Sequence, residues 1–292
     1  MYRLCLLRPD TIIYYETLSA WAPCVYKKWI NKSIRLFIHY HEYTSPEEYK
    51  NEMILNRWLH KIETGIYQHA AWISHTNQDR MQMFLNDIKP VSPANTHILP
   101  NYPPASWQNS LKNKRTDENR IGFVYVGALS LDTMYTKEMA EFVAANSDKY
   151  YWHIYSDTFD KSVTGFLQRL NAGNISFKGS VKYDELPEIL GQYDIGVILY
   201  KGHIPNYIYN APNKLFEYQA CGLNVWFPLE MKGAYPYINE DTPPCVLAIV
   251  FGNLSNLPPG KKIKTNSTLG AAYRYCAEEV LQDLWNVIHI KS

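Results

Sequence analysis

The sequence predicts an α/β protein of two doubly wound domains, each built on a parallel sheet. Along most of the 292 residues, short apolar runs rich in β-branched and aromatic residues alternate with longer amphipathic stretches. A Pro-rich and then polar segment at residues 100–119 interrupts this alternation, which is typical of a linker. Hydrophobic residues make up 46% of the chain, enough for a sizeable core.

The first part of the chain contains four expected strands and two expected helices. TIIYY and RLFIHY have the composition of buried strands, and apolar residues at three- and four-residue spacing predict the helices. The strands are expected at residues 11–15, 35–40, 71–75 and 96–99. The helices are expected at residues 21–30 and 47–67.

A second alternating unit starts at Arg120 with RIGFVYVGALS, a buried strand that ends at a glycine turn. Further strands are expected at residues 151–155, 174–177, 195–199 and 224–227. Helices are expected at residues 137–146, 161–171, 184–192 and 213–221. A long amphipathic helix is expected near the end, over residues 271–290. We therefore predict domains at residues 1–113 and 114–269, followed by a C-terminal helix at 270–292.

Composition excludes several classes of protein. A net charge of +1 argues against a dedicated nucleic-acid binder. The five cysteines are far apart and form no C-x-x-C pair, which predicts reduced thiols in a cytoplasmic protein and no zinc site. The histidines form no H-E-x-x-H motif, so no metal is expected. The first apolar run is too short for a signal peptide, and the run Cys245–Phe251 is too short to span a membrane.

The segment APNKLFEYQACGL, residues 211–223, carries the strongest chemical signal. Proline at its start and Gly222 at its end delimit a short helix. Such a helix begins beyond the carboxyl end of a strand, where its free N–H groups favour a phosphate. Lys214 in the first turn is unfavourable for the helix unless an anion binds there, and Glu217 can accept from a ribose diol. The alternative is an ordinary amphipathic helix with a solvated lysine and glutamate.

This segment resembles the nucleotide-sugar signature of GT-B glycosyltransferases of the family 4, group 1 type. Three more segments resemble that family in the same order: IHYHEYTSPEE with the residues up to HILPNYP, then RIGFVYVGALS, then ISFKGSVKYDELPEILGQYDIGVILY. The resemblance implies two Rossmann-like domains with parallel sheets. It also implies that the N-terminal domain is incomplete, because PDTIIYYE is similar to one of the family's middle strands.

The resemblance further implies a set of donor-binding residues. Glu217 would bind the ribose hydroxyls. The diphosphate would lie against Pro212, Asn213 and Lys214. The loop beneath the phosphates and the sugar would be Gly127, Ala128, Leu129 and Ser130. The base would be bordered by Gly179, Ser180 and Val181.

In the acceptor domain, His41 and Glu42 fall on the family's catalytic His-Glu pair. Without the family pattern, a histidine at a strand end is more often packed or solvated. Glu16 also ends a strand, and its side chain can face the cleft or turn away from it. Two positions depart from the family. Tyr209 stands where relatives carry a glutamate that contacts the sugar, and VGALSLDTMY lacks a basic residue, which leaves Lys214 and Lys201 for the diphosphate.

The resemblance implies a hexosyltransferase that moves a sugar from UDP- or GDP-sugar to a glycan or lipid-linked acceptor, with retention and without a metal. Its setting would be polysaccharide or glycoconjugate biosynthesis. The alternative is a non-catalytic or split subunit that binds nucleotide and needs a partner chain or a second copy. A dehydrogenase is disfavoured because no G-x-G-x-x-G follows a first strand.

One surface feature leaves a membrane interpretation open. Trp21, Trp29 and the pair Lys27-Lys28 lie in the first expected helix, where they could form a face that contacts the inner membrane surface. The alternative is core packing with a solvated lysine pair.

Overall fold

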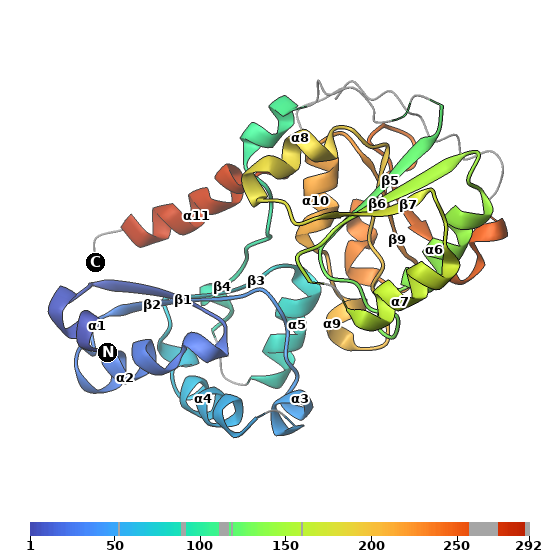
Figure 1. Cartoon of the computed structure of the whole chain (residues 1–292). Helices are drawn as coiled ribbons and strands as arrows, with labels where there is room; N and C mark the ends of the chain where they lie inside the picture. The colour runs from blue at the N-terminus through green and yellow to red at the C-terminus, as the bar shows by residue number, and fades with distance from the viewer. Residues whose placement is uncertain are drawn as a thin grey trace. The chain divides into compact units, whose positions relative to one another are not determined.

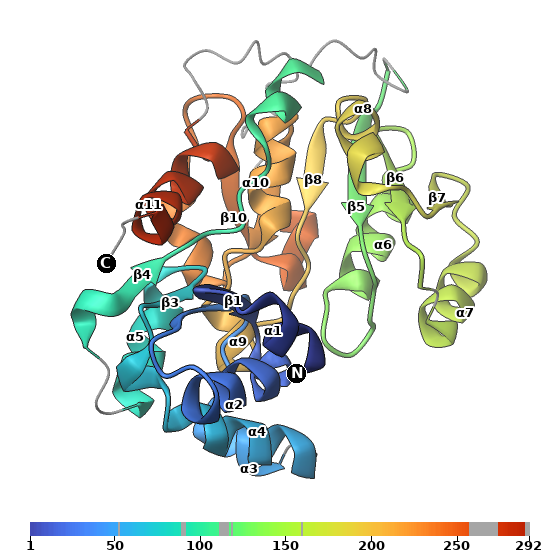
Figure 2. The same ribbon diagram turned by 90° about the vertical axis from the view of Figure 1, so that its left-hand side faces the viewer.

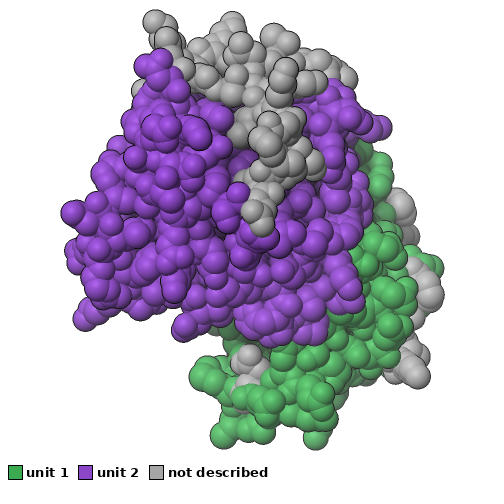
Figure 3. All heavy atoms as spheres, turned by 90° about the vertical axis from the view of Figure 1, so that its right-hand side faces the viewer, with its two compact units in different colours: residues 1–101, 280–292 green, residues 102–279 purple. Residues whose placement is uncertain are grey.

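The computed structural model describes residues 1–51, 53–88, 92–110, 117, 119–158, 160–256 and 274–289. The chain divides into two compact units, which Figure 3 shows in different colours. Unit 1 comprises residues 1–101 and 280–292, and unit 2 comprises residues 102–279. The predicted domain boundaries at 113/114 and 269/270 lie outside the described residues.

Unit 1 contains a parallel sheet of four strands in the order β1-β2-β3-β4. The strands are β1 (Thr11–Tyr15), β2 (Arg35–Tyr40), β3 (Trp72–His75) and β4 (Thr96–Ile98). All four were predicted from their apolar, β-branched and aromatic residues. Because they run parallel, their carboxyl ends lie at one edge of the sheet, where ligands bind in folds of this kind.

Helices cover both faces of this sheet (Figures 1 and 2). One face packs against α2 (Trp21–Trp29), α4 (Ile54–Thr64) and α5 (Gln78–Asp87). On the other face, Leu284 of α11 (Ala277–His289) packs against β2 and β3. Arg35 of β2 donates to the carbonyl oxygens of Val287 and Ile288, at 2.6 and 3.0 Å. A cation is favourable at this C-terminal end of α11 because the helix dipole is negative there.

The prediction of one helix over residues 47–67 is wrong, because this stretch holds α3 (Pro46–Asn51) and then α4. Met53, the residue before α4, has an extended backbone with φ −56° and ψ 147°. Periodicity alone could not reveal this break, since the apolar spacing continues across it. A short helix that was not predicted, α1 (Tyr2–Leu7), precedes β1.

Unit 2 contains a parallel sheet of six strands in the order β10-β9-β8-β5-β6-β7. The strands are β5 (Ile121–Val126), β6 (Tyr150–Tyr155), β7 (Ile175–Gly179), β8 (Ile195–Val197), β9 (Asn224–Pro228) and β10 (Val246–Ile249). Five were predicted. The sixth, β10, lies in the apolar run near residue 250, to which the sequence assigned no element.

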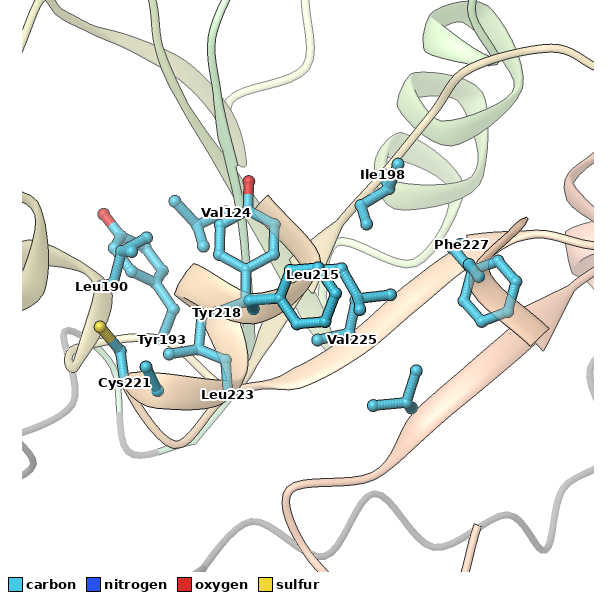
Figure 4. Close-up of a cluster of buried hydrophobic side chains, with 14 of the residues drawn as sticks. Val124, Leu190, Tyr193, Ile198, Leu215, Tyr218, Cys221, Leu223, Val225 and Phe227 are labelled. Carbon is cyan, nitrogen blue, oxygen red and sulfur yellow. The ribbon is translucent and has the colours of Figure 1, made fainter. Parts of the chain in front are cut away.

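Two helical layers enclose this sheet (Figures 1 and 2). α8 (Leu186–Leu190) and α10 (Asn213–Ala220) belong to the core of one face, and α6 (Thr136–Ala145) and α7 (Lys161–Leu170) to that of the other. Figure 4 shows Leu215 and Tyr218 of α10 among the side chains of the first core. A Cβ on Gly196 of β8 would lie 2.2 Å from the Tyr218 ring, so glycine is needed there. No helix in the described ranges is long and apolar enough to cross a bilayer.

Candidate functional site

The start of α10 lies beside the end of β5 in unit 2. Pro212 precedes the helix with an extended backbone, and no side chain among the described residues caps this end. The helix is held against the sheet by Tyr218, whose hydroxyl accepts from the Val126 amide at 3.2 Å. An uncapped helix N-terminus at the carboxyl edge of a parallel sheet favours a bound anion, as the sequence predicted.

Lys214, in the first turn of α10, lies over the glycine that follows β5. A Cβ on Gly127 would be 3.2 Å from Lys214 Nζ, and the backbone φ at this glycine is +124°. Any other residue there would be strained and would displace the lysine. The ammonium group also lies 5.7 Å from the centre of the Tyr125 ring. The structure thus brings together two residues that the sequence assigned separately to the phosphates.

Glu217 lies one turn further along α10 and is only 6% exposed. Burial raises the pKa of its carboxyl group, while the charge of Lys214 and hydrogen bonds from Asn213 and Tyr183 oppose that rise. Asn213 Nδ2 donates to Glu217 Oε1 at 3.3 Å. A carboxylate with a cation and two polar neighbours at a helix start is suited to accept hydrogen bonds from a ligand diol.

The loop after Gly127 is fixed mainly by its own hydrogen bonds. Tyr125 donates its hydroxyl to the Ala128 carbonyl at 2.8 Å, and Thr136 donates to the Ser130 carbonyl at 2.7 Å. The Ser130 hydroxyl accepts from two backbone amides further along, both at 3.2 Å. Leu129 is buried in the core, which leaves only its backbone for a ligand.

The predicted base-binding segment follows β7. Gly179 ends this strand with a φ of +84°, and the space where its Cβ would lie is open. Ser180 is exposed, and Val181 packs against the core. Next to them, Tyr183 is 51% exposed and its ring lies 4.9 Å from that of Trp107. Tyr183 also hydrogen-bonds Glu217, so this aromatic pair, which the sequence analysis missed, lies beside the carboxyl group of α10.

Tyr209, at the position where the family resemblance implies a glutamate, ends the short helix α9 (Pro205–Ile208). Its backbone lies so close to Gly233 that a Cβ there would be 2.5 Å from the Tyr209 carbonyl carbon. The side chain at this position is a phenol, whose oxygen is a weaker acceptor for a sugar hydroxyl than a carboxylate.

A lysine and a carboxylate lie near the loop after β5. Lys201 Nζ donates to the Leu131 carbonyl at 3.2 Å and lies 5.6 Å from the Tyr135 ring centre. The Tyr135 hydroxyl donates to Glu230 Oε1 at 2.9 Å. The sequence analysis missed Glu230, although its place directly after β9 puts it at the carboxyl edge of the sheet.

His41 and Glu42 follow β2, at the carboxyl edge of the sheet in unit 1. His41 is half-buried, and burial lowers the pKa of its imidazole. Asn101 Nδ2 donates to His41 Nδ1 at 2.7 Å, which leaves Nε2 as the protonated nitrogen of the neutral ring. The imidazole ring of His41 stacks on the Tyr15 ring, with 5.6 Å between the two ring centres. The side chain of Glu42 is exposed.

Glu16 supports the turn that carries these two residues. Its carboxylate accepts from the backbone amides of His41 and Glu42, at 2.6 and 3.3 Å. Glu16 has a backbone φ of +60°, which is uncommon for a residue with a side chain. The side chain therefore turns toward the backbone of residues 41–42, which the sequence left open.

Among the described residues, no group of three or more His, Cys, Asp or Glu side chains is arranged to hold a metal ion.

Comparison with known proteins gives two negative results and one set of structural matches. No family model matches the chain, and no curated protein matches it. HepE from Anabaena, solved with UDP and glucose, matches with a TM-score of 0.66 at 12% identity, over 97% of this chain and 79% of that chain. Sucrose-phosphate synthase from Thermosynechococcus elongatus matches with a TM-score of 0.69 at 15% identity, over 98% of this chain and 75% of that chain.

A third match is the lipopolysaccharide outer core galactosyltransferase WaaB, with a TM-score of 0.61 at 12% identity over 98% of this chain and 77% of that chain. The chain has the GT-B fold. The expected fold class, α/β with two parallel sheets, is thereby confirmed. At these identities the likeness concerns the fold, so the activity follows from the site and is proposed below.

Proposed function

We propose that this protein is a glycosyltransferase that moves a hexose from UDP- or GDP-sugar to a glycan or lipid-linked acceptor. The donor would bind to unit 2, with its ribose at Glu217, its diphosphate at Lys214 and Gly127, and its base beside Gly179 and Tyr183. We also propose that it acts in the cytoplasm, in polysaccharide or glycoconjugate biosynthesis. Structural neighbours that hold UDP or UDP-glucose support a nucleotide-sugar donor.

The observation that carries the proposal is the contact between Lys214 and the turn at Gly127. Lys214 lies three residues before Glu217 on the same helix. A lysine beside a glycine turn, together with an uncapped helix N-terminus, forms a binding site for an anion. The buried carboxylate three residues later adds an acceptor for hydroxyl groups. A nucleoside diphosphate carries both chemistries, anionic phosphates and a ribose diol.

In the proposed reaction, the bond between the anomeric carbon and the β-phosphate oxygen breaks, and its electron pair leaves with the diphosphate. An acceptor hydroxyl forms the new bond to the same carbon and passes its proton to an oxygen of the leaving diphosphate. Lys214 and the α10 N-terminus would stabilise the negative charge that develops on the leaving diphosphate. We assign retention of configuration on the resemblance, and a bound metal is not required by this scheme. His41 and Glu42 keep the catalytic role that the resemblance implies.

Tyr209 favours a second candidate, a subunit that binds nucleotide without transferring the sugar. A phenol replaces the carboxylate that the resemblance implies for the sugar with a weaker acceptor, while Glu217 and Lys214 for the nucleotide are retained. Such a subunit would act with a partner chain or a second copy. The two candidates differ in turnover, since only the first releases free UDP or GDP in the presence of an acceptor.

Calorimetric titration with UDP and GDP tests the donor site in the full chain. We expect the wild type to bind at least one of them and Glu217→Gln to bind it about 10- to 100-fold more weakly, because a charged hydrogen-bond acceptor is lost. Glu141→Gln, which changes an exposed carboxylate of α6, is the matched control and should bind like the wild type.

Three outcomes separate the candidates. Absence of binding by both nucleotides, or equal binding by wild type and Glu217→Gln, would contradict the nucleotide site and with it both candidates. Binding together with hydrolysis or transfer of UDP- or GDP-sugar by the monomer supports the transferase. Binding by a chain that stays inactive with a range of glycan acceptors supports the nucleotide-binding subunit.

A further inference from the structure

A second site candidate lies in unit 1, away from the carboxyl edge of its sheet. A hollow of about 850 Å³ opens between α2, the turn that follows α2, and α4. These two helices lie side by side in both ribbon views (Figures 1 and 2). Four lysines line the hollow: Lys27, Lys28, Lys32 and Lys61. None of its lining residues is acidic.

Lys27 is held in place by backbone carbonyl groups, and no acidic side chain among the described residues pairs with the other three lysines. Lys27 donates to the carbonyl oxygens of Lys32 and Ile34 at 3.2 and 2.7 Å, which fixes the turn after α2. Lys28, Lys32 and Lys61 are exposed and form no ion pair with any part of the chain that the structure describes. Like charges brought together repel one another, so an anion in the hollow would relieve that repulsion.

The same hollow has an apolar side. Trp58 of α4 lines it and is 47% exposed, and Leu55, three residues earlier on that helix, is 52% exposed. Trp29, beside Lys28 in sequence, is 74% exposed and lies 5.5 Å from the ammonium group of that lysine. The sequence left two interpretations of α2 open, a membrane-contacting face and packing in the core. Packing in the core is wrong for Trp29, because its side chain is exposed. Large apolar side chains beside a basic surface are typical of proteins that lie on a bilayer.

We propose that this hollow binds the phosphate headgroup of an anionic phospholipid, with Trp58 and Trp29 in the bilayer interface. The lysines account for the phosphate, and the exposed tryptophans account for the lipid, because a free phosphate would gain nothing from them. The proposal does not depend on the nucleotide site in unit 2, so either can fail without the other.

Vesicle sedimentation of the full chain tests the proposal. We expect binding to vesicles of phosphatidylcholine mixed with phosphatidylglycerol, and much weaker binding to vesicles of phosphatidylcholine alone. A triple variant, Lys28→Gln, Lys32→Gln and Lys61→Gln, should bind the mixed vesicles on the order of 100-fold more weakly, about fivefold for each lysine. Its matched control changes three exposed lysines of unit 2, Lys149→Gln, Lys161→Gln and Lys232→Gln, and should bind like the wild type.

A second variant separates a lipid from a soluble anion. Trp58→Ala keeps every charge and should still lose several-fold in binding to the mixed vesicles, whereas Trp285→Ala, an exposed tryptophan outside the hollow, should not. Circular dichroism and urea unfolding confirm that each variant is folded.

Four results would overturn the proposal: equal binding to both kinds of vesicle, equal loss in the control lysine variant, full binding by the triple variant, or no effect of Trp58→Ala. The last result, combined with competition by millimolar glycerol phosphate, would assign the hollow to a soluble phosphate compound.

Discussion

Glu63 in unit 1 and Glu217 in unit 2 are both buried glutamates of a helix, but their surroundings differ. Burial raises the pKa of both carboxyl groups. Glu63 is fully enclosed and accepts hydroxyl hydrogen bonds from Tyr14, Thr17 and Tyr67, at 2.9, 2.9 and 3.1 Å. Those residues come from β1, the turn after it and the segment after α4. Glu63 therefore joins these elements and has no exposed surface for a ligand.

Glu217 has neighbours of another kind. Asn213 is exposed, Tyr183 is about half exposed, and Lys214 supplies a charge that stabilises the ionised carboxyl group. All three can be reached by a molecule that approaches the start of α10. Burial and a raised pKa therefore do not by themselves identify a functional carboxylate. What distinguishes the two is whether the hydrogen-bond partners are themselves enclosed.

The largest effect on stability is expected from Glu63→Ala. It removes the acceptor of three hydroxyl groups in the interior of unit 1, so the free energy of unfolding should fall by about 3 kcal/mol. Urea unfolding followed by circular dichroism measures this loss. UDP or GDP affinity, measured where the variant is folded, should stay at the wild-type value.

The matched control is Glu47→Ala in α3, where the side chain is 86% exposed and only 3.9 Å from Lys50 in a surface pair. Its free energy of unfolding should change by less than about 1 kcal/mol. A Glu63→Ala variant as stable as this control would break the comparison, because Glu63 would then not be a structural link.

A smaller effect concerns the charge beside Glu217. Lys214→Met removes the cation that lowers the pKa of the Glu217 carboxyl group, so this pKa should rise. If nucleoside binding needs the ionised carboxylate, affinity is lost as pH falls through that pKa, and in Lys214→Met the loss should begin at a higher pH. Titration with uridine or guanosine, which carry no phosphate, isolates this effect from the direct contact of Lys214 with the diphosphate.

If nucleoside affinity depends on pH in the same way in the wild type and in Lys214→Met, Lys214 does not act on Glu217. Lys137→Met, on the surface of α6, controls for the removal of a positive charge elsewhere in unit 2.

The smallest effect is the pH dependence of stability that Glu63 produces. Burial raises its pKa in the folded protein above the ordinary value of a glutamate, so the folded state holds this proton more tightly than the unfolded chain. Stability therefore falls as pH rises from the unfolded pKa through the folded one. Glu63→Gln cannot ionise, and its free energy of unfolding should decline less over that window. Equal slopes for the two proteins in urea unfolding across this pH range would contradict the assignment.

Most of the secondary structure could be predicted because it depends on neighbours a few residues apart. Alternation of apolar and amphipathic segments located nine of the ten strands in the described part of the chain. The tenth, β10, was missed because its short apolar run carries no adjoining helical pattern that would mark it. The split between α3 and α4 was missed because the apolar spacing runs through Met53.

The candidate site was predictable in part for the same reason. Lys214 and Glu217 are three residues apart on one helix, so their proximity follows from helix geometry. Tyr183 and Glu230 were not found, because their partners lie more than thirty residues away along the chain. Glu16 could be placed at a strand end, but the direction of its carboxylate depends on the amides of residues 41–42.

The sequence alone predicted an α/β fold with two parallel β-sheets. It also predicted that a short helix with Lys214 and Glu217 begins beyond the end of a strand. Both follow from local periodicity and from the chemistry of a helix N-terminus. Only the tertiary structure decided that Glu63 is enclosed while Glu217 keeps reachable partners, and that four lysines converge on one hollow. Burial and electrostatic environment depend on which distant segments pack together, and no local pattern encodes that packing.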